Sequence, residues 1–296
     1  MRISVVTKYF QPSIFEIKDL IKEAQKKKVE IEVLDVRDFK EVVNKKDWGD
    51  VIFWRSSSMG AGKTKTKSFR HLSKKGIFIF NSCLIKYPRT SYKDFQQKFF
   101  LANHSSRVNT IPTYYCKNEK DFRKLIEAGI LTFPIVVKPK IGSQGKGIRI
   151  LEKKNLKKEL RKINFPSFLF QNFIKNDSDY RIIILGGKSL GIMRRVAKKG
   201  SCINNISQGG HAQLVKDAKL RQKLEKLALF IASSLELSIC GVDIIQDLDS
   251  KKLFFMEINT APEWKGFKRV TKKNVAKKII EFGIKEYTKI QKESKC

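Results

Sequence analysis

The chain has 296 residues, of which 41% are hydrophobic and 10% aromatic, and it carries a formal net charge of +33. This composition provides for one large or two smaller domains with a buried core and excludes wholesale disorder. No apolar run is long enough to span a bilayer, and Lys8 interrupts the N-terminal apolar stretch too early for a secretory signal. We therefore expect a cytoplasmic protein with no membrane partner.

The positive charge has two explanations that the sequence leaves open. A field of this size attracts polyanions, so an acidic protein tail, a ribosome or a nucleic acid is a natural partner. Alternatively, the charge reflects an AT-rich genome, because lysine outnumbers arginine and the lysines are scattered along the whole chain. The five cysteines form no closely spaced pair, which indicates reduced thiols and disfavours a disulfide framework or a zinc site.

The first hundred residues alternate between short apolar runs and one helical pattern. Ile14, Ile17, Leu20, Ile21 and Ala24 recur at helical spacing. Strands alternating with helices predict a parallel α/β sheet. The predicted strands are residues 2–6, 29–36, 50–54 and 77–80, and the predicted helix is residues 13–28.

From residue 135 onward the predicted strands lie closer together. Short turns such as Gly186-Gly187 between them favour antiparallel hairpins. Helical periodicity recurs in three segments, of which the last is a basic amphipathic helix. The predicted strands are residues 135–138, 147–151, 168–172, 181–185, 189–193, 240–246 and 253–259, and the predicted helices are residues 93–103, 217–237 and 275–290.

A stretch that ends in Gly62-Lys63-Thr64 imitates a phosphate-binding P-loop. The motif requires a small, flexible residue at its first position, and Ser57 stands there. The next predicted strand ends in Asn81, where a magnesium-binding Asp would be needed. We interpret residues 57–64 as a solvated surface loop.

Polar residues inside apolar strands predict a metal site. In the strand 253–259, alternation puts Phe254, Met256 and Ile258 on one buried face and Glu257 and Asn259 on the other. A carboxylate and an amide oxygen on one rigid surface suit a hard cation such as Mg²⁺. Asp243, in the neighbouring predicted strand, would supply a third ligand.

A glycine-bearing loop follows another buried strand. Lys138 ends that strand, so its ammonium group would be held at the rim of the sheet. The next residues contain three glycines, Ser143 and free backbone amides, as a cover over phosphate groups requires. About a hundred residues separate this loop from the predicted metal ligands, and the two together predict a nucleotide site.

These residues resemble the ATP-grasp ligases, specifically the RimK-type group that includes ribosomal-protein and cofactor glutamate ligases. The resemblance is strongest in residues 134–147, 169–210 and 241–267. It implies an α/β fold of the ATP-grasp type, in which a parallel α/β domain precedes two α+β subdomains that clamp ATP. The expected boundaries are 1–90 for the first domain and 91–296 for the ATP-grasp domain, divided into 91–170 and 171–296.

The resemblance also assigns roles to individual residues. It implies metal binding by Asp243, Glu257 and Asn259, and catalytic roles for Arg195 and Asn205. It implies nucleotide contacts from the lysine, the glycine-rich loop, the adenine-binding hinge and the Asp-x-Arg pair after the hinge. These residues are Lys138, Gly142, Ser143, Gln144, Gly145, Gly147, Gln171, Asn172, Phe173, Ile174, Asp179, Arg181 and Asn204.

The sequence departs from the family pattern at three places, and the last two leave the acceptor open. Asn172 replaces an acidic hinge residue, Ile203 replaces an arginine, and Glu263-Trp264 replaces a glycine-rich segment on the acceptor side. The resemblance implies a carboxylate–amine ligase that forms an amide through an acyl phosphate, adding an amino acid such as glutamate to a protein or peptide. A small-metabolite ligase and a non-catalytic relative that binds ATP or RNA are the alternatives.

The cofactors implied are ATP and Mg²⁺, with two ions and with Mn²⁺ as a substitute. The implied partners are an amino acid, a carboxylate acceptor that is either a protein tail or a small molecule, and an acidic or ribosomal partner drawn by the charge. The oligomeric state is left open.

Overall fold

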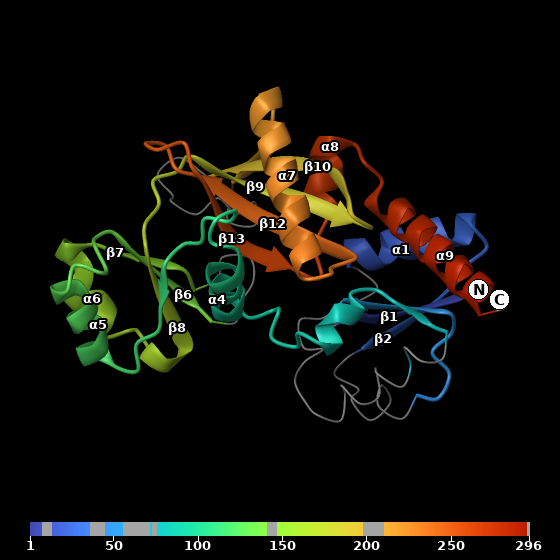
Figure 1. Cartoon of the computed structure of the whole chain (residues 1–296), viewed down its shortest axis with the longest axis horizontal. Coiled ribbons are helices and arrows are strands. Elements are labelled where there is room, and N and C mark those ends of the chain that lie inside the picture. Colours follow the sequence, from blue (N-terminus) through green and yellow to red (C-terminus); the bar gives the residue numbers. More distant parts are fainter. Residues whose placement is uncertain are drawn as a thin grey trace.

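The structure is a computed structural model that describes residues 1–7, 14–35, 45–55, 72, 76–140, 147–197 and 210–294. Three sheets build it (Figure 1). The first is a four-stranded parallel sheet of order β2-β1-β3-β4. Its strands are β1 (Arg2–Thr7), β2 (Glu30–Asp35), β3 (Val51–Arg55) and β4 (Phe78–Ile79), and α1 (Phe15–Lys26) connects the first two. The parallel α/β arrangement predicted for this region is confirmed.

A second sheet and two short α-helices form a lobe on the opposite side of the molecule (Figure 1). All three strand pairs of this sheet are antiparallel, in the order β5-β8-β6-β7. Asn118 caps the first helix by accepting a hydrogen bond from Asp121 N. The elements are β5 (Thr113–Tyr114), α5 (Glu119–Glu127), β6 (Ile135–Pro139), β7 (Arg149–Leu151), α6 (Leu156–Leu160) and β8 (Phe168–Asn172), with 3₁₀ turns at Lys153–Asn155 and Phe165–Ser167.

The third sheet lies between the other two and is antiparallel, in the order β11-β10-β9-β12-β13. Helix α7 (Ala218–Ser234) packs against β9, β10 and β12, and α4 (Lys93–His104) packs against β13. The strands are β9 (Ser178–Leu185), β10 (Lys188–Val196), β11 (His211–Leu214), β12 (Ile239–Gln246) and β13 (Leu253–Asn259). The predicted antiparallel hairpins are therefore confirmed.

The chain then returns to the N-terminal sheet. A 3₁₀ turn at Ser82–Ile85 precedes α4, and α8 (Lys265–Thr271) and α9 (Val275–Glu293) follow β13. Helix α9 lies against α1 (Figure 1). Gly186, at the turn between β9 and β10, has φ +54°, and a Cβ atom there would lie 2.3 Å from the Phe282 ring. Glycine at this turn therefore lets α9 approach the third sheet.

The buried side chains form three clusters. Two of them mix residues of the N-terminal sheet with residues of the third sheet, and one of these two also contains residues of the last helices. Val5 and Phe53, for example, share that cluster with Ile183 and Trp264. The third cluster contains only residues between Cys116 and Phe170. The boundaries expected at residues 90 and 170 stay a prediction, but the lobe has a core of its own.

Two further observations concern the described part of the chain. None of its helices is long and apolar enough to cross a membrane. Cys83, Cys116 and Cys240 are buried and unbridged, as is common for thiols that act as small core residues.

Candidate active site

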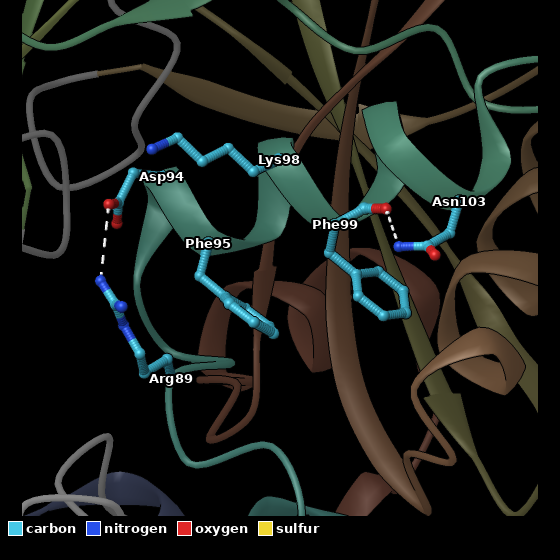
Figure 2. Close-up of a pocket in the computed structure, with 6 residues that line it drawn as sticks. All are labelled: Arg89, Asp94, Phe95, Lys98, Phe99 and Asn103. Atoms are coloured by element: carbon cyan, nitrogen blue, oxygen red, sulfur yellow. Dashed lines mark hydrogen bonds and ion pairs between the residues drawn. The ribbon is translucent and has the colours of Figure 1, made fainter.

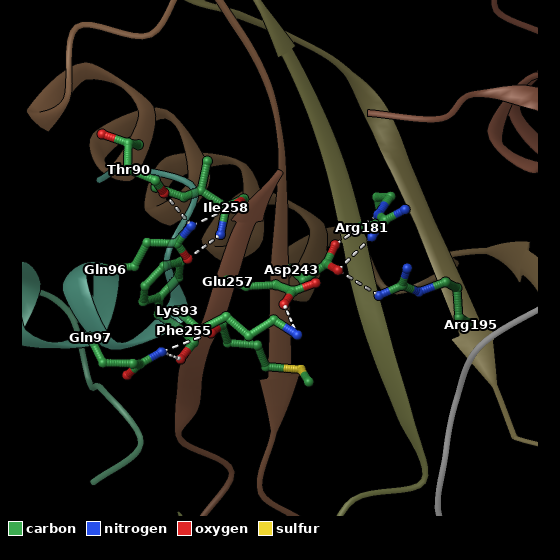
Figure 3. Close-up of polar contacts among 11 residues, drawn as sticks. Thr90, Lys93, Gln96, Gln97, Arg181, Arg195, Asp243, Phe255, Glu257 and Ile258 are labelled. Atoms are coloured by element: carbon green, nitrogen blue, oxygen red, sulfur yellow. Dashed lines mark hydrogen bonds and ion pairs between the residues drawn. The ribbon is translucent and has the colours of Figure 1, made fainter. Parts of the chain in front are cut away.

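The three predicted metal ligands lie on two paired strands. Asp243 of β12 stands opposite Glu257 of β13, and Gly241 stands opposite Asn259. Directly opposed residues on an antiparallel pair have neighbouring side chains on one face of the sheet. Figure 3 shows the two carboxylates side by side. The sequence placed these side chains together correctly.

The burial predicted for the opposite face of β13 is wrong in part. Phe254 and Met256 are only half-buried, whereas Phe255 and Ile258 are buried. The register shifts after Asp243, where Phe255 rather than Met256 pairs with the next residue of β12. This bulge adds one residue to β13 and breaks the alternation on which the prediction depended.

Asp243 is held by two arginines, Arg181 of β9 and Arg195 of β10. Its Oδ1 accepts a hydrogen bond from Arg181 Nε at 2.8 Å, and its Oδ2 accepts from Arg181 Nη2 at 2.6 Å and from Arg195 Nη2 at 2.9 Å. Burial by itself would raise the pKa of Asp243, but the charges of the two arginines lower it to about 2. The carboxylate is therefore ionised at neutral pH.

Asp179 binds the other side of Arg195. The Arg195 Nε–H donates to Asp179 Oδ1, and both side chains are 5% exposed. Burial raises the pKa of Asp179 to about 6, and the Asp243 charge adds to the increase while Arg195 opposes it. The Nε and Nη2 groups of Arg195 thus each donate to a different acid, which fixes the plane of the guanidinium.

Glu257 and Lys138 complete the charged cluster. Lys93, at the start of α4, places its Nζ 3.2 Å from Glu257 Oε2. Lys138 on β6 is only 5% exposed, and within the described part of the chain it makes no ion pair. Burial and, to a smaller extent, the Lys93 charge lower the pKa of Lys138 to about 8, while the Glu257 charge acts in the opposite direction. A buried ammonium without a contacting counterion suits an anionic ligand.

Two glutamines of α4 hold the backbone around Glu257 (Figure 3). Gln96 Oε1 accepts from Ile258 N at 2.8 Å, and its Nε2 donates to Ile258 O at 2.8 Å and to Thr90 O at 2.6 Å. Gln97 Nε2 donates to Met256 O at 2.7 Å and to Phe255 O at 3.1 Å. The peptide units on both sides of Glu257 are therefore fixed by one helix.

The predicted hinge comprises the last two residues of β8 and the two residues after it. Gln171 is buried and donates to Thr113 Oγ1 at 2.5 Å, and Phe173 N donates to Pro134 O at 3.1 Å. Asn172 accepts from Thr132 N at 2.9 Å and donates to Ile130 O at 3.1 Å. Ile174 O accepts from Asn176 Nδ2 at 2.7 Å. Asn172, where the family carries an acid, thus fixes the loop before β6.

The glycine-rich loop is described only at its end. Gly147 has φ +79°, and a Cβ atom there would lie 2.9 Å from Pro139 Cγ, so the turn requires glycine. The remaining predicted residues lie outside the described residues, as does the P-loop-like stretch 57–64. They are Gly142, Ser143, Gln144, Gly145, Asn204 and Asn205.

A pocket of about 310 Å³ opens beside α4 and is separate from the candidate active site (Figure 2). None of the predicted site residues lines it. Its walls are Arg89, Asp94, Phe95, Lys98, Phe99 and Asn103.

Sequence reasoning missed the contribution of α4. Lys93, Gln96 and Gln97 have the spacing i, i+3 and i+4, so they share one face of the helix. The polar side chains on this face, next to the apolar residue Phe100, were the sequence signal that could have indicated a role for this helix. It could not identify a partner strand about 160 residues away in the chain.

Comparison with known proteins agrees with this geometry. The model of the RimK-like ATP-grasp domain matches residues 62–282. "Probable alpha-L-glutamate ligase 2" of Hahella chejuensis is 33% identical over 181 residues, which are 59% of this chain and 57% of the relative. The chain thus spans just over half the length of that relative.

Solved structures of low sequence identity share the fold. A D-alanine–D-alanine ligase from Bacillus anthracis complexed with ATP superposes with a TM-score of 0.69 at 20% identity, covering 99% of both chains. The ATP-grasp ligase PsnB, complexed with a variant of its minimal precursor, Mg and ADP, gives a TM-score of 0.71 at 15% identity, covering 96% of this chain and 98% of PsnB. The family model spans well over half of the sequence, and the chain belongs to the RimK-like ATP-grasp family.

Proposed function

We propose that the protein is an ATP-dependent carboxylate–amine ligase. In the proposed reaction a substrate carboxylate oxygen attacks the γ-phosphorus of ATP and ADP leaves. An amine nitrogen then attacks the acyl carbon, loses a proton and displaces phosphate, which leaves an amide. The observation that carries this proposal is the pairing of Asp243 with Glu257 on one sheet face, close enough to Lys138 for Glu257 to influence its pKa.

The donor set fits a magnesium ion bound together with a nucleotide. The described residues contain no group of three His, Cys, Asp or Glu side chains able to hold a metal alone. Mg²⁺ usually binds one or two protein carboxylates and fills its other positions with substrate phosphates and water. Asp243 and Glu257 would supply the carboxylates. Asn259 Oδ1, which accepts one hydrogen bond from Ala261 N at 3.1 Å, keeps a second lone pair for the ion.

The charges around the site suit phosphoryl transfer. When bound, the ion would neutralise part of the phosphate charge. Lys138 would contact the phosphates from β6, and Arg195, held in plane by Asp179 and Asp243, would face the charge that develops during transfer. Fixed cations require little reorganisation as the reaction proceeds, so the residues act mainly by position and charge.

The proposal is tested by measuring ADP release with Mg²⁺, ATP, single amino acids and acidic peptides. We expect a carboxylate substrate to stimulate release, and Glu257→Gln to reduce it by about 100-fold or more because one anionic ligand is lost. Glu236→Gln is the matched control, since Glu236 is exposed and its one ion pair among the described residues is with Lys86, at 3.1 Å. The absence of stimulation by any carboxylate, together with an unchanged rate in Glu257→Gln, would refute the ligase function.

The finer proposal is that the protein transfers glutamate to a peptide carboxylate. Curated relatives bear the name alpha-L-glutamate ligase, and PsnB was solved with a precursor peptide. A small-molecule acceptor is the second candidate, because the exposed lysines are spread over α6, α7 and α9 rather than gathered at the site. Mass spectrometry of products formed from peptide and metabolite pools separates the two: a mass increase of one glutamate on a peptide favours the first.

A further inference from the structure

Arg55 is a buried cation whose hydrogen-bonding capacity is not used up. It is the last residue of β3 and is 9% exposed. Its Nη2 donates to Pro262 O at 3.3 Å, and the guanidinium lies over the Trp264 ring, 4.5 Å from its centroid. Its buried Nη1 has no hydrogen-bond partner among the residues that the structure describes. No acid of the described residues forms an ion pair with it, since Glu16 and Glu263 act only through longer-range attraction.

An uncompensated cation at this depth is costly to maintain. Burial lowers the pKa of Arg55 to about 10, which shows how strongly the surroundings disfavour its charge. Removing a contacting anion from a buried arginine leaves an unpaired charge that strongly destabilises a protein. A cation–π contact offsets only part of this cost. The arrangement is therefore typical of a group that awaits an anionic ligand.

The position of Arg55 joins it to the proposed active site. β3 belongs to a parallel sheet, and ligands of such sheets bind beyond the carboxyl ends of the strands. Pro262, which accepts the Arg55 hydrogen bond, lies three residues after Asn259. A Cβ atom on Gly241 would lie 3.2 Å from Pro262 Cβ and 3.9 Å from Arg181 Nε. Pro262 therefore packs between Arg55 and the strand that carries Asp243.

The neighbouring segment is fixed against movement. Glu16 accepts hydrogen bonds from Trp264 N at 2.9 Å and Lys265 N at 3.2 Å, and Asp19 accepts from Trp264 Nε1 at 3.0 Å. The ring under Arg55 is thus held by α1. A rigidly supported guanidinium presents its fork in one orientation, which is how planar carboxylates are recognised.

We infer that Arg55 binds a carboxylate of the amino-acid substrate, one that does not itself react. This inference rests on the proposed function, because it takes an amino acid to be one of the ligase substrates. The class of ligand follows from the burial and the positive charge of Arg55. A small anion with a planar carboxylate can reach a buried guanidinium, whereas the surface of a folded protein cannot reach it. Arg55 would then set the orientation of the amino acid relative to Asn259 and Asp243.

The test compares wild type, Arg55→Met and Arg55→Lys by calorimetric titration with L-glutamate in the presence of Mg²⁺ and ADP. We expect Arg55→Met to weaken glutamate binding by about tenfold to a hundredfold, as for loss of a charge-assisted hydrogen bond. Arg55→Lys should lie between, because it keeps the charge and loses the fork. Arg107→Met is the matched control: Arg107 also lies over an aromatic ring, Phe230, 5.1 Å from its centroid.

Neutral analogues identify the contact directly. Wild type should bind either glutamine or isoglutamine more weakly than glutamate, since each lacks one carboxylate, and Arg55→Met should lose that discrimination. Thermal melting separates this role from a purely structural one. Removing an unpaired buried cation should leave the melting temperature unchanged or raise it, whereas loss of a structural contact should lower it.

Each result of these measurements either supports or overturns the role inferred for Arg55. Equal glutamate affinity in wild type and Arg55→Met, a lower melting temperature with unchanged affinity, or no glutamate binding by wild type would each overturn the inference. Inorganic phosphate that competes with glutamate only when Arg55 is present would show that the site takes anions in general, and would overturn the carboxylate assignment. Arg55-dependent binding without any ADP release would sustain the inference and refute the ligase function.

Discussion

At the scale of single residues, the site is organised by charges whose pKa values are moved by burial. Lys138 shows the consequence most directly, since burial lowers its pKa to about 8 and this value lies within the range of an ordinary assay. Below that pH the ammonium is charged in both the folded and the unfolded chain. Above it the folded protein loses the charge first, because the unfolded lysine has a pKa near 10.5.

We predict opposite pH trends for nucleotide binding and for folding. ATP affinity should fall as pH rises through 8, by up to about tenfold per pH unit, because only the charged form binds phosphate strongly. The contribution of Lys138 to stability should instead improve between pH 8 and 10.5, since the cost of burying its charge disappears. Nucleotide titrations and urea unfolding at pH 7 to 10 measure both trends. Lys138→Arg should abolish the affinity trend; a variant that keeps it would contradict the assignment.

Some residues of the site could be predicted from the sequence and others could not. Asp243, Glu257 and Lys138 were predictable because a charged residue in an apolar strand is conspicuous, and alternation then places it on a face. Arg55 and Lys93 gave no such signal. Each lies near a polar segment of the sequence. The role of each depends on a residue that comes close only in the folded chain, which is Pro262 for Arg55 and Glu257 for Lys93.

At the scale of elements, α4 and β13 act as one unit. Strand positions followed from hydrophobic patterning, so the predicted ranges agree with β12 and β13. The bulge at Met256 did not follow, because it depends on how β13 pairs with β12 rather than on local sequence. The contacts of Gln96 and Gln97 with β13 likewise depend on tertiary packing.

We predict that Gln96→Leu will loosen β13 and weaken the proposed metal site. The change removes the partners of Ile258 N and O, and each unpaired buried group costs about 1–3 kcal/mol. Urea unfolding should show this loss, and Mn²⁺ titration followed by electron paramagnetic resonance should show weaker binding. Asn103→Leu, an exposed amide on the same helix that contacts Phe99 O, is the control. An unchanged unfolding midpoint in Gln96→Leu would contradict the prediction.

At the scale of the whole molecule, the parts of the chain are defined by the hydrophobic core that they share and not by their order along the sequence. Segments from both ends of the sequence bury their side chains together, as Val5 and Ile279 do. The lobe between Cys116 and Phe170 buries a smaller, separate set. Its position to one side of the molecule in Figure 1 agrees with this independence. A region with fewer buried apolar contacts opens at a lower free energy.

We predict that the lobe opens before the rest of the protein. In hydrogen exchange followed by mass spectrometry at low urea, peptides covering β6 and β8 should exchange earlier than peptides covering β9 and β12. Addition of Mg²⁺ and ATP should slow the lobe preferentially if the nucleotide bridges it to the third sheet, because a ligand stabilises the regions that it contacts. Simultaneous exchange of all four strands would show a single cooperative unit instead.

The side-chain contacts of β13 also bear on self-association. β13 is the terminal strand of its sheet, and an open strand edge recruits strands from other chains into aggregates. Here Gln96, Gln97 and Asn109 occupy the outward backbone groups of Phe255, Met256 and Ile258. Two glutamine amides imitate the hydrogen bonds of a missing neighbour strand. The strand that carries the proposed metal ligands Glu257 and Asn259 is thereby closed to pairing, and neither a second copy nor an extended substrate can lengthen the sheet there.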